Sequence, residues 1–163
     1  MAVSQWLLDR AAVTPRAAGA MPITLPKMGR MDLPWMTRQL KYRAGAEIGV
    51  WRGKYSAAFC QVNPRLQMLC VDPWVSYPAW RDTKNALTGD EAAAMMDQSY
   101  RDAVARLSRF TNATIVRKFS VEAAAAVPDR SLDFVYIDGN HVRDAVLEDL
   151  TVWSPKVKPG GFI

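Results

Sequence analysis

Short runs of apolar residues alternate along the chain with longer stretches in which apolar residues recur at helical spacing. The short runs predict buried strands and the longer stretches predict helices. The first predicted strand ends at 47–50, and three more span 66–71, 113–116 and 131–138. A fifth strand is predicted to follow a turn at 158–161. Helices are predicted at 54–62, 90–110, 121–126 and 142–152. Repeated β-α units predict an α/β fold with a doubly wound, mainly parallel sheet and helices on both faces.

The first 43 residues follow a different pattern, which divides the chain into an N-terminal cap segment (1–43) and an α/β domain (44–163). In the cap segment, 4–13 is predicted to form a short helix and 22–34 an irregular connector with three prolines. A second helix begins at Leu33-Pro34-Trp35, and we expect one side of it to cover the core. The residues assigned to that side are Trp35, Met36 and Leu40, with Arg43 as a further candidate, and the alternative role is to cap a cofactor pocket.

The predicted helix over 90–110 has acidic residues early and arginines late, as the helix dipole favours. Its expected apolar face consists of Ala94, Met95, Gln98, Tyr100, Ala103, Val104 and Leu107. The polar insert before it, 76–89, is either a surface loop or a segment that closes over a ligand.

Composition argues against a nucleic-acid-binding protein, a cysteine metal site and a membrane protein. The 163 residues are 50% hydrophobic and 23% charged, with a formal net charge of +5. Lys and Arg are scattered, which favours a solvated surface over a nucleic-acid face. Cys60 and Cys70 have no metal-binding spacing and fall within predicted core elements, which favours a cytoplasmic protein with buried thiols. No membrane span or signal peptide is predicted.

Polar residues stand where the predicted strands end, and in an open parallel sheet this edge binds the ligand. Glu47, Asp72 and Asp138 each close a buried strand, and Ser120 follows the strand 113–116. Gly49 permits a tight turn after the first strand. The pattern predicts a nucleotide-like cofactor, with loop capping by the acids and packing by the glycines as the alternative.

Five motifs occur in a fixed order from residue 44 to 163: Glu-Ile-Gly-Val-Trp-Arg-Gly, Val-Asp-Pro-Trp, Phe-Ser-Val-Glu-Ala, Leu-Asp-Phe-Val-Tyr-Ile-Asp-Gly-Asn-His and Pro-Gly-Gly. Together they resemble the class I S-adenosylmethionine-dependent methyltransferases, most of all the branch that methylates oxygen on small molecules and sugars. The resemblance implies a Rossmann-like fold, S-adenosylmethionine as cofactor and a small-molecule acceptor, which the sequence does not identify.

The resemblance also assigns roles to residues. The implied cofactor-binding residues are Glu47, Gly49, Val50, Gly53, Asp72, Pro73, Trp74, Ser120, Val121 and Asp138. Glu47 and Gly49 would contact the methionine end, and Asp72 would accept both ribose hydroxyls. Pro73 and Trp74 would pack on the adenine, and Ser120 and Val121 would border its edge.

Asp138 and His141 are the predicted catalytic residues. Asp138 would face the methyl-transfer region, and in metal-dependent relatives the matching aspartate binds a divalent ion, so Mg²⁺ is a second candidate cofactor. His141, three residues later, is the only histidine and could remove a proton from the acceptor. The alternative is that Asp138 or Asn140 caps the following helix and that His141 packs in its first turn.

Two other interpretations remain open. A nicotinamide-dependent oxidoreductase would need Gly-x-Gly-x-x-Gly, and Trp51 stands where the second glycine belongs. A non-catalytic cofactor-binding or scaffold module would fit a sheet that lacks its last strands, since the chain stops at Gly160-Gly161-Phe162-Ile163. An exposed sheet edge at that point favours pairing with another chain, such as a second copy in a homo-oligomer.

Overall fold

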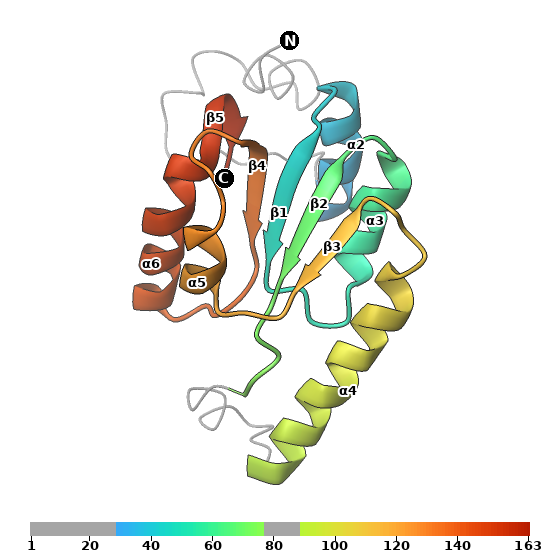
Figure 1. Ribbon diagram of the computed structural model, residues 1–163, viewed down its shortest axis with the longest axis vertical. Coiled ribbons are helices and arrows are strands. Elements are labelled where there is room, and N and C mark those ends of the chain that lie inside the picture. Colours follow the sequence, from blue (N-terminus) through green and yellow to red (C-terminus); the bar gives the residue numbers. More distant parts are fainter. Residues whose placement is uncertain (1–28, 77–88) are drawn as a thin grey trace.

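The computed structural model describes residues 29–76 and 89–163, which build a five-stranded parallel sheet (Figure 1). The strands are β1 (Ala44–Ile48), β2 (Gln67–Val71), β3 (Ala113–Val116), β4 (Leu132–Ile137) and β5 (Val157–Phe162), in the spatial order β3-β2-β1-β4-β5. The chain adds strands on one side of β1 and then crosses to the other side. This is the predicted doubly wound fold, and the crossing point lies between β1 and β4.

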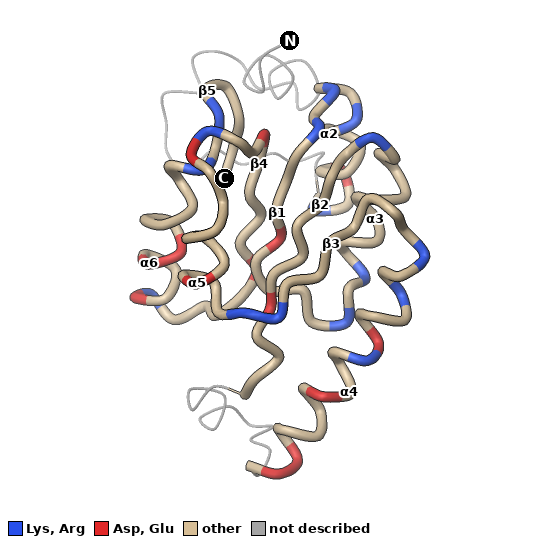
Figure 2. The backbone as a smooth tube through the Cα atoms, viewed as in Figure 1, with Lys and Arg blue, Asp and Glu red and all other residues tan. Residues whose placement is uncertain are grey.

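Helices cover both faces of the sheet (Figure 1). One face carries α2 (Leu33–Gln39), α3 (Lys54–Val62) and α4 (Gly89–Leu107), and the other carries α5 (Ser120–Ala125) and α6 (Arg143–Trp153). Short 3₁₀ turns, η2 (Arg30–Asp32) and η4 (Ser154–Lys156), precede α2 and β5. The predicted helix over 4–13 and most of the insert 76–89 lie outside the described residues. Lys and Arg are spread over many elements, as they are in the sequence (Figure 2).

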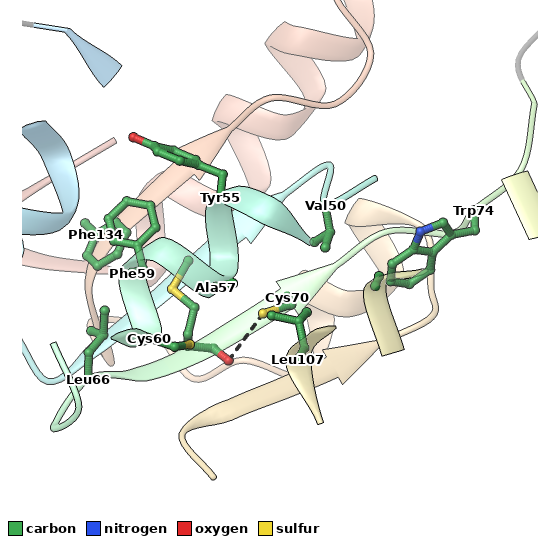
Figure 3. Close-up of a cluster of buried hydrophobic side chains, with 12 residues drawn as sticks. Val50, Tyr55, Ala57, Phe59, Cys60, Leu66, Cys70, Trp74, Leu107 and Phe134 are labelled. Atoms are coloured by element: carbon green, nitrogen blue, oxygen red, sulfur yellow. Dashed lines mark hydrogen bonds between the residues drawn. The ribbon is translucent and has the colours of Figure 1, made fainter. Parts of the chain in front are cut away.

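Helices bury both faces of the sheet, and successive strand residues point to opposite faces, so each strand contributes to two cores. Along β2, Met68 and Cys70 join the core under α3 and α4, where Figure 3 labels Cys70, whereas Val71 joins the core under α5 and α6. This two-sided burial explains why the strands read as continuous apolar runs. Cys60 and Cys70 are free and buried, as predicted.

Two predicted helix faces are correct only in part: Met36 of α2 and Ala103 and Leu107 of α4 are buried as expected, but other predicted positions are exposed. In α2, Met36 is buried but Trp35 is 53% exposed, because neighbouring helix residues point about 100° apart. In α4 the buried face is rotated from the predicted one, and Gln98 and Val104 lie on the exposed side. Its buried residues are Ala92, Met96, Ser99, Ala103 and Leu107.

The Pro-Gly-Gly segment lies inside β5 and does not form a turn that precedes the strand, as the sequence had suggested. The pairing of β4 with β5 shifts register between Leu132 and Phe134, so the segment forms an irregular stretch of strand. A Cβ on Gly161 would lie 2.3 Å from the Asp133 carbonyl oxygen. Glycine is therefore needed at this position because the backbones of β4 and β5 approach closely. Because Pro-Gly-Gly is also typical of turns, the sequence pattern predicts a turn here instead.

Candidate functional site

The carboxyl ends of β1, β2 and β4 lie side by side and bring three acidic residues to one edge of the sheet. Glu47 pairs in register with Cys70 on β2 and with Tyr136 on β4. Past the strand ends, the Gly49 amide donates to the Val71 carbonyl (2.9 Å), and the Asp138 amide donates to the Ile48 carbonyl (2.7 Å). The sheet therefore places Glu47, Asp72 and Asp138 at the edge where the sequence predicted a ligand.

Gly49 makes the turn after β1 possible. Its φ is +92°, and a Cβ there would lie 2.4 Å from the Asp138 carbonyl oxygen, which no side chain could tolerate. Val50, the next residue, is buried in the core. Gly53 immediately precedes α3 and is buried against Leu107 of α4. The predicted glycine turn is thus a real backbone feature that brings the loops after β1 and β4 into contact.

Asp72 ties the turn after β1 to the turn after β2. Its Oδ2 accepts hydrogen bonds from the amides of Val50 and Trp51 (both 2.9 Å), and its Oδ1 accepts one from the amide of Trp74 (2.7 Å). A carboxylate has about four lone-pair positions, and three are taken. Contacts among the described residues leave one position on Oδ1, so the predicted contact with both ribose hydroxyls stays a prediction.

Two tryptophans fix the shape of this edge. The Trp74 indole is buried, packs against Tyr100 of α4 with ring centroids 4.9 Å apart, and donates from Nε1 to the Trp51 carbonyl (2.7 Å). Trp51 is exposed and donates from its own Nε1 to Ser99 Oγ (2.8 Å). Trp74 is thus placed as a core residue, next to a half-buried Pro73, and adenine packing by both stays a prediction.

Ser120 and Val121 follow β3 at the start of α5. The Ser120 hydroxyl accepts a hydrogen bond from Trp153 Nε1 (2.8 Å) and also interacts with the Asp149 carboxylate, so it joins α5 to α6. Val121 is exposed. A contact between either side chain and adenine stays a prediction.

Glu47 is the most deeply buried carboxyl group of the site, with 2% of the residue exposed. Burial raises its pKa to about 8. The hydrogen bond from the Ser56 hydroxyl opposes this shift, and the nearby Asp138 charge adds to it. In the absence of a ligand, Glu47 is therefore largely protonated near neutral pH. A cationic ligand at this edge would favour its ionised form.

We expect Glu47 to make folding less favourable as the pH rises from 5 to 8. Its folded pKa of about 8 lies above the ordinary glutamate value of 4.5, so between these values the folded state holds a proton that the unfolded state has released. The free energy of unfolding then falls by up to about 1.4 kcal/mol per pH unit. Urea unfolding at several pH values should show Glu47→Gln gaining stability over the wild type across this range, whereas exposed Glu122→Gln should not. A pH-independent Glu47→Gln difference would contradict the assignment.

Asp138 lies among polar and aromatic groups from three elements. Its Oδ2 is 3.7 Å from Arg30 Nη1 and its Oδ1 is 3.9 Å from His141 Nε2, with the imidazole largely exposed. Burial first, and the Asp138 charge second, raise the pKa of Tyr136, so this phenol stays protonated and can donate to Asp138. The Tyr136 ring also packs on Tyr55, with centroids 4.8 Å apart. The structure therefore brings the two predicted catalytic residues together and adds Arg30 and Tyr136.

Sequence reasoning missed Arg30, Trp51 and Ser99. Arg30 comes before the first motif in an irregular stretch, where no periodicity marks its position. Trp51 interrupts a glycine motif, and its bulk had served only to argue against a dinucleotide. Ser99 was hidden by the partly wrong assignment of the α4 face.

No group of three His, Cys, Asp or Glu side chains within 29–76 and 89–163 is arranged to hold a metal ion. Mg²⁺ prefers six oxygen ligands, including waters, and the Asp138–His141 pair alone does not provide such a site. The metal role of Asp138 stays a prediction. None of the described helices is both long and apolar enough to cross a membrane.

A cleft of about 450 Å³ opens beside Asp138, between β4, β5 and α6. Tyr136, Asn140 and His141 supply its polar groups, and the described residues that line it include no Asp, Glu, Lys or Arg. The rest of the wall is mainly aliphatic and aromatic: Leu33, Val135, Ile137, Val146, Leu150, Phe162 and Ile163. This volume is typical of small-molecule sites.

Comparison with known proteins finds a methyltransferase family model and solved methyltransferase structures. A family model described as a methyltransferase domain matches residues 46–163. The chain is 26% identical to the uncharacterised protein y4gI of Sinorhizobium fredii over 135 residues, which cover 79% of this chain and 13% of that protein.

Two solved structures share the fold. The O-methyltransferase TomG of Streptomyces achromogenes, solved with SAM, matches with a TM-score of 0.57 and 15% identity over 94% of this chain and 61% of its own. SAH-bound methyltransferase PaMTH1 of Podospora anserina matches with a TM-score of 0.54 and 13% identity over 98% and 65%. The chain spans less than two thirds of either structure.

Proposed function

This chain belongs to the methyltransferase-domain family, and we propose that it is an S-adenosylmethionine-dependent methyltransferase acting on a hydroxyl group of a small molecule or sugar. The observation that carries the proposal is the grouping of Glu47, Asp72 and Asp138 at the ends of three adjacent strands. S-adenosylmethionine has a sulfonium, an ammonium and two ribose hydroxyls, all of which suit carboxylates. The pyrophosphate of a dinucleotide would meet like charges at the same edge.

In this account, the methionyl end lies over the Gly49 turn between Glu47 and Asp138. Asp72 holds one ribose hydroxyl through the remaining lone-pair position on Oδ1. Gly49 keeps the turn open, and the start of α5 with Ser120 and Val121 borders the adenine. These assignments are supported by where the strand ends lie and by the order of the motifs.

The bound cofactor supplies a methyl carbon on a positively charged sulfur, which is a good leaving group. The chain therefore has to align an acceptor hydroxyl with that carbon and receive the hydroxyl proton. His141 lines the cleft, its Nε2 lies 3.9 Å from Asp138 Oδ1, and either side chain can accept that proton. Tyr136 orients Asp138 by donating to it.

The cleft supports an uncharged acceptor. Its lining is mainly apolar, with an amide, a phenol and an imidazole as the polar groups. An acceptor with an apolar ring and a hydroxyl would place the ring against Leu150 and Phe162 and the hydroxyl near His141. A cytoplasmic location, expected from the buried thiols, belongs to the same proposal.

Calorimetric titration tests the cofactor assignment. We expect S-adenosylmethionine to bind the 163-residue chain with micromolar affinity and NAD not to bind under the same conditions. Saturable binding of NAD, or a folded chain that binds neither compound, would contradict the proposal. Binding of S-adenosylmethionine without transfer to any hydroxyl-bearing acceptor would instead indicate a non-catalytic module.

A further inference from the structure

Arg30 is a positively charged residue that lies next to the acidic residues at the strand ends. Its charge opposes the raised pKa of Glu47 and that of Tyr136, and its Nη1 lies 3.7 Å from Asp138 Oδ2. The residue belongs to η2, ahead of β1 in the chain, yet it reaches the end of β4. Within the described residues, the ligand-binding edge therefore combines three carboxyl groups with the guanidinium of Arg30.

Local contacts hold Arg30 in place. Its guanidinium carbon lies 4.5 Å from the centroid of the Tyr55 ring, a cation–π geometry. The Tyr55 hydroxyl donates to the Arg30 carbonyl, and the Asp32 carboxylate accepts from the Gly29 amide (2.8 Å), which closes the 3₁₀ turn. Arg30 is thus positioned from both its backbone and its side chain.

The Arg30 guanidinium has N–H donors available for a ligand. An arginine carries five N–H donors in a planar fork, and a charge-assisted hydrogen bond to a carboxylate is about 2.7–2.9 Å long. The contact with Asp138 is longer, at 3.7 Å, and 57% of the Arg30 side chain is exposed. Within the described residues, its other contact is with the face of Tyr55, which uses no N–H group.

We propose that Arg30 binds the α-carboxylate of the methionyl end of S-adenosylmethionine, an inference that rests on the proposed function. The charges match group by group: the acidic strand ends suit the ammonium and sulfonium, and Arg30 suits the one carboxylate. Its fork can form two parallel hydrogen bonds with that group, which a lysine could not. On binding, Arg30 exchanges Asp138 for the ligand carboxylate, which leaves Asp138 available to the acceptor hydroxyl.

The test compares S-adenosylmethionine with its decarboxylated form, which keeps the sulfonium and the ammonium but lacks the carboxylate. By calorimetry, we expect Arg30→Ala to weaken binding of S-adenosylmethionine by roughly 10- to 100-fold and to change binding of the decarboxylated compound by less than about threefold. Arg30→Lys should lie between the wild type and Arg30→Ala. Arg38→Ala is the matched control, since Arg38 lies on α2 and bonds to the Val62 carbonyl, and it should change neither affinity.

The outcomes separate this inference from the proposed function. If the wild type binds S-adenosylmethionine but Arg30→Ala weakens both compounds equally, or neither, Arg30 does not bind the carboxylate and the proposed function stands. If the folded wild type binds neither compound, both proposals fail. Thermal unfolding of each variant shows whether a loss of affinity reflects a loss of fold.

Discussion

Replacing Gly49 with alanine is expected to lower the free energy of unfolding by roughly 2–5 kcal/mol and to remove measurable cofactor binding. The added Cβ would lie 2.4 Å from the Asp138 carbonyl oxygen and 2.6 Å from the Gly139 Cα, and the φ of +92° disfavours any side chain. Relief requires the loops after β1 and β4 to move apart, which opens the site. Urea unfolding and calorimetry with S-adenosylmethionine measure the two effects.

Gly139→Ala is the matched control for stability. It lies in the loop against Gly49, but its added Cβ would have no neighbour closer than 3.7 Å, the Ile48 carbonyl oxygen. We expect its unfolding free energy to stay within about 1 kcal/mol of the wild type. Equal losses in both variants would show that the close approach at Gly49 is not what the turn requires.

Asp72→Asn is expected to lower the free energy of unfolding by about 2–4 kcal/mol and the affinity for S-adenosylmethionine by at least about tenfold. The carboxylate accepts three backbone amides from two turns. An asparagine has one oxygen and would direct an NH₂ group at amides that also donate. The turn that contains Val50 and Trp51 would lose hydrogen bonds from its amides, and the ribose would lose its carboxylate acceptor.

Asp129→Asn provides the control for removal of a carboxylate charge. Asp129 is exposed and pairs with Lys156 (2.7 Å), and it precedes β4, at the end of that strand opposite Asp138. We expect a stability change below about 1 kcal/mol and unchanged affinity. An Asp72→Asn variant as stable and as tightly binding as Asp129→Asn would refute the role of Asp72.

Much of the fold could be predicted from the sequence because two-sided burial leaves a strong signal. The helix predicted over 54–62 and the strand over 113–116 coincide with α3 and β3, since buried apolar runs alternate there with helical spacing. The acidic residues at the strand ends were likewise predictable, because in a parallel sheet the residues that follow neighbouring strands meet at one edge. Glu47 and Asp138 are close in space although more than half of the chain separates them.

The remaining features depend on contacts that a sequence pattern does not encode. The buried face of α4 includes Ser99, whose hydroxyl is bonded to Trp51, so apolar spacing alone located the buried face only in part. Trp74 lies in the core because its indole fits against Tyr100 and its Nε1 finds the Trp51 carbonyl. Arg30 reaches the site from an irregular turn, which no periodicity could reveal.

A crystal structure of the chain with S-adenosylhomocysteine would test most directly whether the cofactor binds at the acidic strand ends. We expect the ligand over the ends of β1, β2 and β4, with a ribose hydroxyl within hydrogen-bond distance of Asp72 Oδ1 and the methionyl carboxylate at Arg30. A ligand bound elsewhere would contradict the account. A ligand at this edge with its ribose away from Asp72 would contradict it as well.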